Sequence, residues 1–351
     1  MSNITIGVDL GDKKHVIYAI DKIGRMLSNC QIDNNEESLH SFFSQYKGAT
    51  VAIEAGTHSP WISRLLTSMG CTVLVGNPRR LRAIWADNDK SDIRDAEMLA
   101  RIARFDPQLL YPITHRGEQA QIDLKLLQSR DILVKSRSSL INHIRGSVKA
   151  FGDRLPQCSS ESFHRQASEH LPKELQAPLQ PLLNTIEQLT LQIKEFDAWV
   201  EQISKERYRE TGLLRAVKGV GPITALAFIL ILEDPTRFSK SRQVGKFIGL
   251  TPRRDQSGEI DKQLRITKAG NPFLRRLLVS AAQYILGPFG EECNLQRFGL
   301  RLTRQGGKNA KRRAVVAVAR KLAVLLHRLW QHGEIYNPLY KQQTGQLLKA
   351  A

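Results

Sequence analysis

The spacing of apolar residues changes near residue 118, and this change constrains the fold more than any other feature of the sequence. Before it, short apolar or alternating runs are bounded by turn-forming residues, a pattern that predicts β-strands. After it, apolar residues recur every three or four positions, which predicts long helices. We therefore expect an α/β N-terminal domain followed by a helical remainder without strands.

The order of the elements predicted in the first hundred residues narrows this expectation. Strands are predicted at residues 4–9, 15–21, 26–32, 50–54 and 72–76. Helices are predicted around residues 37–46 and at residues 59–69, where Pro60 suits the first turn. Three strands, a helix, a strand, a helix and a strand is the order of the RNase-H-like (RuvC-like) fold, so we predict that fold here.

Two long helices are predicted in the middle of the chain. Leu126, Leu133 and Leu140 recur every seven residues, ahead of a helix end near Gly152. A second helix shows heptad spacing over residues 182–203, and residues 155–181 connect the two as a stretch that contains Pro and Ser. This pair predicts an antiparallel arm or a dimerisation coiled coil, while the core of an ordinary helical bundle fits the spacing equally well.

These patterns divide the chain into three expected domains, which are residues 1–115, a helical coiled-coil region at 116–208, and a mainly α-helical C-terminal domain at 209–351. In the last domain, helices are expected at residues 272–286 and 309–330, with a Gly- and Arg-rich loop at 300–307 between them. The apolar stretch 223–232 is about half of the roughly 20 residues that a membrane span needs. With no secretory signal pattern at the N-terminus, we expect a cytoplasmic protein without a membrane partner.

The positive charge of the chain is unevenly distributed. The formal net charge is +18, and residues 211–330 hold 23 Lys and Arg against 7 Asp and Glu, a net +16. Such a field attracts polyanions, so a nucleic acid is the expected partner. Charge by itself gives no evidence of catalysis, because proteins that only package nucleic acids share it. The four cysteines lack the spacing of a zinc site or a disulfide framework.

Four acidic residues are the candidate metal ligands and catalytic residues. Asp9 ends the first predicted strand and Glu54 ends the fourth, and these two strand ends can lie side by side in a sheet of this order. Asp92 and Asp95 are three residues apart in a predicted helix and so share one face. Carboxylate oxygens suit Mg²⁺, and one or two such ions can act on a phosphodiester. Taken singly, each acid is explained as a turn, cap or solvated helix residue.

Ser257 is the candidate nucleophile. It lies in a turn that follows two arginines, whose guanidinium groups would bind a phosphate and neutralise developing negative charge. A serine hydroxyl is a weak nucleophile unless a base or a metal activates it. On the residues alone, a plain hairpin turn on a phosphate-binding loop is the simpler explanation.

The candidate nucleic-acid-binding residues lie in the same C-terminal region. A Gly turn at residues 219–221 ahead of an apolar helix resembles a helix-hairpin-helix element, whose backbone N–H groups can approach a phosphate. A turn between two packed helices explains it as well. The full candidate set is Gly219, Gly221, Arg253, Arg254, Lys262, Arg265, Lys268, Arg275 and Arg276.

Short motifs spread over nearly the whole chain form a recognisable set. They are Gly7-Val8-Asp9, Ile53-Glu54-Ala55, Lys90-Ser91-Asp92-Ile93-Arg94-Asp95-Ala96, Gly219-Val220-Gly221, Phe247-Ile248-Gly249-Leu250-Thr251-Pro252, Ser257-Gly258, Thr267-Lys268-Ala269-Gly270-Asn271 and Ala319-Arg320-Lys321-Leu322. Together they resemble the DEDD transposases of bacterial insertion sequences related to the pilin-gene DNA invertases. That group includes bridge-RNA-guided serine recombinases.

The resemblance implies roles for the candidate residues. Asp9, Glu54, Asp92 and Asp95 match the metal tetrad of the family's RuvC-like domain, and Ser257 matches the serine that becomes covalently joined to DNA. It also implies Mg²⁺ as cofactor, a structured guide RNA as a partner beside DNA, and a homodimer that assembles to a tetramer. The C-terminal part would be a transposase domain that completes a composite active site.

One local sequence departs from this resemblance. Relatives often have Glu-Ala-Thr-Gly or Glu-Ala-Ser-Gly after the second acid, whereas this chain has Glu54-Ala55-Gly56-Thr57-His58. The change keeps the carboxylate and alters the loop that follows it. None of the nine histidines forms a pair at metal-ligand spacing, and His58 is the one singled out because it lies near Glu54.

Three functions are compatible with the sequence. The leading hypothesis is a transposase or site-specific recombinase that cuts and rejoins DNA through a phosphoserine intermediate. The alternative is a RuvC-like metal-dependent nuclease that hydrolyses junction or branched DNA without a covalent intermediate. A non-catalytic architectural protein that binds DNA or RNA is the third, and clustered acids argue against it because they would repel a polyanion in the absence of metal.

Overall fold

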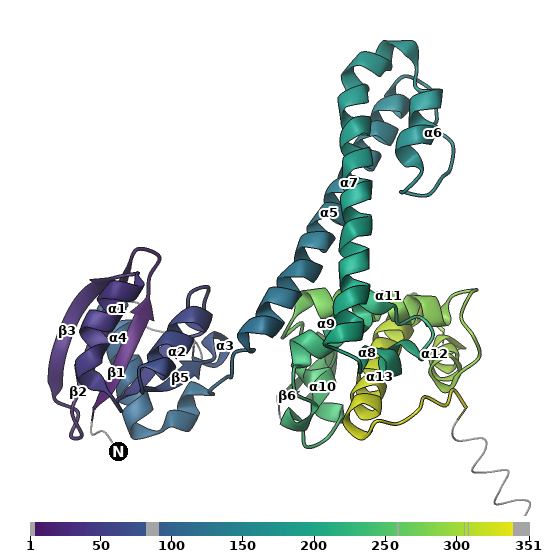
Figure 1. Ribbon diagram of the computed structural model, residues 1–351. Helices are drawn as coiled ribbons and strands as arrows, with labels where there is room; N and C mark the ends of the chain where they lie inside the picture. Colours follow the sequence, from purple (N-terminus) through teal and green to yellow (C-terminus); the bar gives the residue numbers. More distant parts are fainter. Residues whose placement is uncertain (1–3, 82–90, 258–259, 305, 308, 340–351) are drawn as a thin grey trace, which may run out of the picture. The chain divides into compact units, whose positions relative to one another are not determined.

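The computed structural model describes residues 4–81, 91–257, 260–304, 306–307 and 309–339 (Figure 1). The chain forms two compact units, residues 1–116 and residues 117–351. The first is a mixed α/β unit, and the second is helical apart from one β-hairpin. In the described part of the chain, no helix combines the length and the apolar character needed to cross a membrane.

The N-terminal unit contains one mixed sheet. Its strands are β1 (Thr5–Leu10), β2 (Lys14–Ile20), β3 (Met26–Asp33), β4 (Thr50–Glu54) and β5 (Thr72–Gly76). They lie in the order β3-β2-β1-β4-β5. The first three form an antiparallel meander, and β4 and β5 run parallel to β1. A strand lies at each of the five positions that apolar patterning predicted.

Helices cover both faces of this sheet. α1 (Glu36–Phe43) and α2 (Ser59–Ser68) pack on one face, and the core between them and the sheet includes Ile6, Val8, Val51 and Ile53. α4 (Asp92–Phe105) packs on the other face. Because side chains alternate along a strand, Gly7 in β1 and Ala52 in β4 point toward α4. The short helix α3 (Pro78–Leu81) follows β5.

A glycine permits the close packing of α4 on β1. A Cβ atom at Gly7 would lie 1.9 Å from the carbonyl oxygen of Ala96 and 2.6 Å from the backbone nitrogen of Ala100. Both atoms belong to the helix backbone, which cannot move aside as a flexible side chain can. The absence of a side chain at residue 7 therefore sets the distance between helix and sheet.

The direction of α4 follows from a contact near its C-terminus. Near its C-terminus, Arg104 donates from Nη1 to the carbonyl oxygen of Lys22, 3.4 Å away, in the turn after β2. This turn lies beside the start of β1, because Ile20 pairs with Thr5. The helix therefore runs antiparallel to β1, and its first turn lies at the end of β1 that carries Asp9.

Two long antiparallel helices begin the second unit, as the heptad spacing predicted. α5 (Glu118–Ala150) and α7 (Lys173–Glu206) run side by side, with α6 (Phe163–His170) packed at their far end (Figure 1). The predicted connection over residues 155–181 is shorter in the structure, because α7 begins at Lys173, and it contains the helix α6. Burial of Leu175 and Leu179 against α6 stabilises this first part of α7 despite Pro178 and Pro181.

The base of this two-helix arm shares a core with the C-terminal helices. Leu124 and Leu127 of α5 and Val200 and Ile203 of α7 belong to the same buried cluster as the helices that follow. The hydroxyl of Tyr208 donates to Oδ2 of Asp123 over 2.7 Å and adds a buried polar contact there. The arm is thus continuous with the C-terminal body.

Six further helices build the C-terminal body in the described part of the chain. They are α8 (Thr211–Arg215), α9 (Pro222–Leu232), α10 (Arg242–Phe247), α11 (Pro272–Leu286), α12 (Asn294–Arg304) and α13 (Ala310–His332). α9 is its central element, since every residue from 224 to 232 is buried. α12 extends to Arg304, so the loop predicted at residues 300–307 is helical in its first half.

The body also contains a hairpin that the apolar spacing did not predict. β6 (Pro252–Ser257) pairs antiparallel with β7 (Ile260–Ile266). Every described side chain from Arg253 to Arg265 is exposed, so the hairpin has no apolar face that would produce a strand-like alternation. The expectation that strands disappear after residue 118 is wrong at this place.

Substituting Gly7 with alanine should destabilise the N-terminal unit. The added Cβ would overlap backbone atoms of α4, and we expect a loss of at least about 3 kcal/mol, the upper end of ordinary overpacking costs. Gly146→Ala is the matched control, because this glycine lies within α5 with open space around it and alanine favours helix by up to about 1 kcal/mol. Chemical unfolding of both variants measures the difference, and equal stability would contradict the packing described.

The stability of the N-terminal unit should fall in mild acid because of His15. Its side chain is fully buried in β2, and neither ring nitrogen has a hydrogen-bond partner among the described residues. Burial lowers the pKa of His15 below its ordinary value of 6.5. The unfolded chain therefore takes up a proton that the folded chain resists, and unfolding becomes easier as the pH falls below about 6.5.

Urea unfolding at about pH 7.5 and about pH 5.5 tests this origin of the acid sensitivity. His15→Leu should reduce the difference between the two midpoints, whereas His40→Leu, at an exposed position of α1, should leave it unchanged. An unaltered pH dependence in His15→Leu would rule His15 out as its source.

Candidate active site and nucleic-acid interface

Asp9 and Glu54 are neighbours across two parallel strands. The register of β1 and β4 pairs Val8 with Ile53, and Asp9 and Glu54 occupy the next position in each strand. Alternation puts both on the face that carries Gly7 and packs against α4. Both side chains are half-buried. The predicted proximity of these two strand ends is therefore present in the backbone.

Asp92 and Asp95 form the first turn of α4. The helix is capped by Ser91, whose Oγ accepts a hydrogen bond from the N–H of Arg94 over 3.3 Å. The alternative explanation of Asp92 as the N-cap is therefore wrong. Ala96 and Leu99 of α4 are buried against the sheet. Asp92 and Asp95 lie on the same side of the helix, closer to its N-terminus.

Strand register and helix direction bring the backbones of these four acidic residues to one corner of the N-terminal unit. The positive end of the α4 dipole favours negative charge in its first turn. Among the residues that the structure describes, no three His, Cys, Asp or Glu side chains are grouped closely enough to hold a metal ion. Carboxylate oxygens are the ligands that Mg²⁺ prefers, and the role of these four residues as metal ligands stays a prediction.

A polar cluster joins the two loops that follow Asp9 and Glu54. His58 Nε2 lies 3.3 Å from Asp12 Oδ1, between the loop after β4 and the turn after β1. Asn34, at the end of β3, donates from Nδ2 to the carbonyl oxygens of Asp12 (2.9 Å) and Gly11 (3.4 Å). Of these residues the sequence indicated His58 alone. Asn34 could not be predicted, because its role depends on contacts 22 and 23 residues away.

Ser257 is the last residue of β6, next to the tip of the exposed hairpin. Its side chain is exposed, and its neighbours Gly258 and Glu259 lie outside the described residues. Ser257 belongs to the second compact unit, whereas the four acidic residues belong to the first. Its position beside a hairpin turn is the one that the simpler explanation assigned, so catalysis by Ser257 stays a prediction.

The base of this hairpin is held by two glycines. A Cβ at Gly249 would lie 2.1 Å from the carbonyl oxygen of Ala269, and a Cβ at Gly270 would lie 2.0 Å from that of Phe247. Both glycines also have positive φ angles, which favour glycine. The motif at residues 247–252 and the motif at residues 267–271 thus pack backbone against backbone and fix the start and the end of the hairpin.

Three of the predicted nucleic-acid-binding arginines have partners within the protein. Arg254 pairs with Asp261 across the hairpin. Arg275 donates from Nη1 to the carbonyl oxygens of Ile248 (2.8 Å) and Ala269 (2.9 Å), and Arg276 pairs with Asp131 of α5 at 2.6 Å. These contacts give the three residues a structural role.

The other four predicted cations are exposed, as Arg254 and Arg276 also are. They are Arg253, Lys262, Arg265 and Lys268, and all lie on the hairpin or directly after it. Binding of nucleic acid by this set stays a prediction, and their exposure leaves their charges accessible to a phosphate backbone.

The Gly turn before α9 is explained in part by packing. Gly219 has φ +90°, and a Cβ there would lie 3.0 Å from the ring of Tyr284 and 3.1 Å from the carbonyl oxygen of Ala281 in α11. Gly221 precedes the first residue of α9, and a Cβ there would meet no atom within 4 Å. Close packing accounts for Gly219, while open space at Gly221 is compatible with approach of a ligand.

Comparison with known families defines the class of the protein. A family model described as "Transposase IS116/IS110/IS902 family" matches residues 211–292, and a second model, described as "Transposase" and representing the IS110-type DEDD domain, matches residues 6–151. The two matches include β1, β4, α4 and the hairpin. The chain is therefore a transposase or recombinase of insertion sequences.

Individual relatives align with nearly the whole chain. It is 26% identical to the "Probable family 20 transposase" of Pseudomonas aeruginosa, over 95% of this chain and 98% of that protein. It is 27% identical to the transposase for insertion sequence element IS1111A of Coxiella burnetii, over 94% of this chain and 90% of that protein. It is also 25% identical to the pilin gene-inverting protein of Moraxella bovis, over 93% and 95%. The chain belongs to the IS110/IS116 family of DEDD transposases.

Removing the side chain of Asn34 should weaken DNA cleavage. Asn34→Ala deletes both hydrogen bonds to the turn after β1, so the segment that follows Asp9 is held less firmly. By analogy with residues that orient metal ligands, the Mg²⁺ concentration for half-maximal cleavage should rise about tenfold or more. Asn29→Ala, at an exposed position of β3, is the control. An identical Mg²⁺ titration for both variants would remove Asn34 from the site.

Proposed function

We propose that this transposase exchanges DNA strands through a covalent phosphoserine intermediate, with Mg²⁺ bound by the N-terminal unit. The observation that supports this most is the shared corner of the sheet: Asp9 and Glu54 end two parallel neighbouring strands, and α4 begins beside them. The sheet order β3-β2-β1-β4-β5 further supports assignment of the N-terminal unit to the RNase-H-like fold.

Asp9, Glu54, Asp92 and Asp95 are the proposed Mg²⁺ ligands. Four carboxylates at one corner repel one another, and a divalent cation relieves that repulsion. One or two bound Mg²⁺ ions supply Lewis-acid stabilisation of the negative charge that develops on the phosphate oxygens. The polar cluster of His58, Asp12 and Asn34 keeps the two ligand-bearing loops in a fixed relation.

Ser257 is the proposed nucleophile. Its Oγ attacks a DNA phosphorus, a new P–O bond forms, and the bond to a deoxyribose oxygen breaks; that oxygen leaves with a proton as a free hydroxyl. Attack of a hydroxyl from another strand on the phosphoserine then restores the phosphodiester and releases Ser257. The exposed cations Arg253 and Lys262 on the same hairpin are suited to hold the phosphate during both steps.

Two further parts of the proposal concern partners. A structured guide RNA beside DNA is supported by the family resemblance and by the net charge of +16 over residues 211–330. Assembly of a homodimer to a tetramer is supported by the family resemblance and by the heptad spacing of the two arm helices. Sizing the protein with and without nucleic acid tests this assembly.

A metal-dependent nuclease is the competing function. In that case water attacks the phosphodiester, and Ser257 contacts phosphate without forming a bond to it. Exposure of Ser257 at the end of a hairpin is compatible with either role, so the covalent adduct distinguishes them.

A suicide DNA substrate should trap the wild-type protein. We expect a covalent protein–DNA adduct in the presence of Mg²⁺, no adduct with Ser257→Ala, and a reduction of about 10²-fold or more with Asp92→Asn, since a ligand is lost. Denaturing gel electrophoresis of labelled DNA measures the adduct. Ser239→Ala, a serine outside the proposed machinery, should form it normally. Cleaved DNA without any adduct in the wild type would establish the hydrolytic alternative.

A further inference from the structure

A broad basic groove lies between α12 and α13, and one residue of its lining, Thr251, directly precedes the hairpin that carries Ser257. Its volume is about 1640 Å³, larger than the roughly 300–1,000 Å³ of pockets that enclose small molecules. The two helices lie side by side in the C-terminal body (Figure 1). A hollow of this size is suited to a segment of a polymer.

The walls of the groove carry an excess of positive charge. Its lining includes six arginines and one lysine, which are Arg242, Arg297, Arg301, Arg304, Arg320, Arg328 and Lys321. Two acidic residues line it as well, and each is bound by an arginine of the groove: Glu292 by Arg297 at 2.8 Å and Glu334 by Arg328 at 3.1 Å. The remaining excess of cations attracts a polyanion.

The cations follow the helical repeat. Arg297, Arg301 and Arg304 are spaced by four and three residues and so form one stripe along α12. Lys321 and Arg328 are seven residues apart and lie on one face of α13. Two charged rows along neighbouring helices match the repeating charges of a nucleic-acid backbone.

The floor of the groove is apolar. It contains Leu295, Phe298, Val324, Leu325 and Leu329 between the basic walls. Phe298 is half-buried, and Lys321 Nζ lies 4.0 Å from the centre of its ring. Unpaired bases expose flat apolar faces that stack on such surfaces, whereas a duplex keeps these faces inside its own stack.

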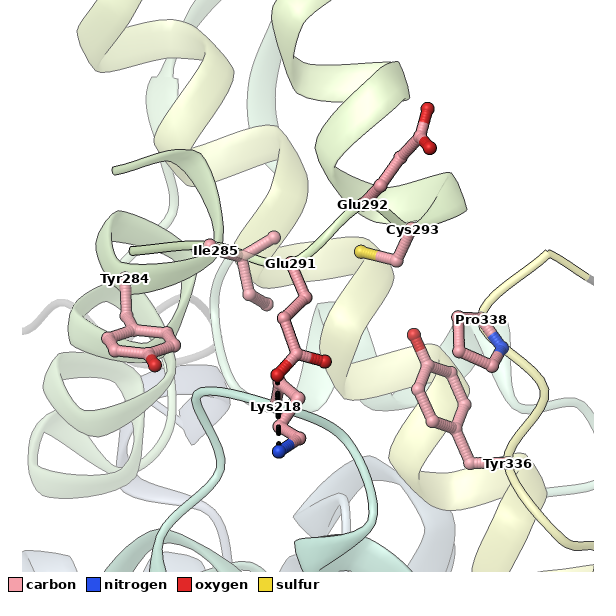
Figure 2. Close-up of a pocket in the computed structure, with 9 residues that line it drawn as sticks. Lys218, Tyr284, Ile285, Glu291, Glu292, Cys293, Tyr336 and Pro338 are labelled. Atoms are coloured by element: carbon pink, nitrogen blue, oxygen red, sulfur yellow. Dashed lines mark ion pairs between the residues drawn. The ribbon is translucent and has the colours of Figure 1, made fainter. Parts of the chain in front are cut away.

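A small pocket, largely apolar in its lining, adjoins the groove. Glu292, Tyr336 and Pro338 line both spaces, and Figure 2 shows them with the Lys218–Glu291 ion pair, whose Nζ–Oε1 distance is 3.2 Å. The pocket holds about 20 Å³, enough for one water molecule and too little for a base. Burial and the neighbouring Cys293 raise the pKa of the Tyr336 hydroxyl, which therefore stays a neutral donor.

We propose that the groove between α12 and α13 binds a single-stranded segment of nucleic acid, with phosphates on the basic walls and bases against the apolar floor. The groove shares no residue with the candidate set on the hairpin and at residues 219–221. The proposal rests on the nucleic-acid partner of the proposed function and is independent of its covalent chemistry. Binding measured without Mg²⁺ therefore tests it separately from adduct formation.

Fluorescence anisotropy of the full chain with labelled oligonucleotides tests the groove. The probes are oligothymidylate and oligouridylate of about 12 nucleotides, within the site sizes of single-strand grooves, and a blunt duplex of the same length. The variant Arg301→Glu/Arg304→Glu reverses two exposed charges of α12. The variant Lys194→Glu/Lys205→Glu makes the same change in charge at exposed positions of α7, outside the groove.

We expect the α12 variant to bind both single strands about tenfold or more weakly and the α7 variant to bind them as the wild type does. The slope of log affinity against log salt should decrease by about 1.4 in the α12 variant, about 0.7 for each lost phosphate contact. Tighter wild-type binding of oligouridylate would identify RNA as the source of the segment, and tighter binding of oligothymidylate would identify DNA.

Three results would overturn the proposal. Unchanged single-strand affinity in the α12 variant would exclude the groove, provided that circular dichroism shows both variants folded. An equal loss of duplex affinity would show a site for double helices instead. A change in oligomeric state with unchanged oligonucleotide binding would identify the groove as an interface between protein chains.

Discussion

The contact between α4 and β1 at Gly7 determines the arrangement of the N-terminal unit. Without a side chain at that position, the helix backbone reaches the strand, and Ala96 and Ala100 lie directly on it. The same contact fixes how far the first turn of α4 lies from the end of β1. In this protein, a glycine without a functional group therefore positions the helix that carries Asp92 and Asp95.

Much of this fold could be predicted from the sequence, because the spacing of apolar residues reflects which faces of the strands and helices are buried. The strands of the first sheet and the two long helices bury whole faces, and burial imposes periods of two and of three to four residues. In the β6–β7 hairpin the described side chains from Arg253 to Arg265 are exposed, so no such period marks its strands. Close backbone contacts at Gly249 and Gly270 hold its base. The start of α7 was missed for another reason: the heptad spacing that predicted this helix begins at residue 182, whereas residues 173–181 are helical and pack against α6.

The candidate site, too, could be predicted from the sequence only in part. The ends of β1 and β4 were predicted to be neighbours because the order of elements implies parallel strands there. The position of Asn34 depends on where β3 ends relative to the turn after β1, which no local pattern encodes. The basic groove combines residues from 242 to 338, and its arginines formed a recognisable row only once α12 was known to continue to Arg304. The overall charge predicted a nucleic-acid partner without locating this surface.

The shared core at the base of the arm has a consequence for dissecting this protein. Leu124 and Leu127 near the start of α5 and Val200 and Ile203 near the end of α7 complete the hydrophobic interior of the C-terminal body. A fragment starting at residue 209 would lack these side chains and expose the apolar surface that they cover. Shortening the arm from its far end, by equal amounts in both helices, would preserve that interior. The length of the arm can therefore change during evolution while the C-terminal body stays intact.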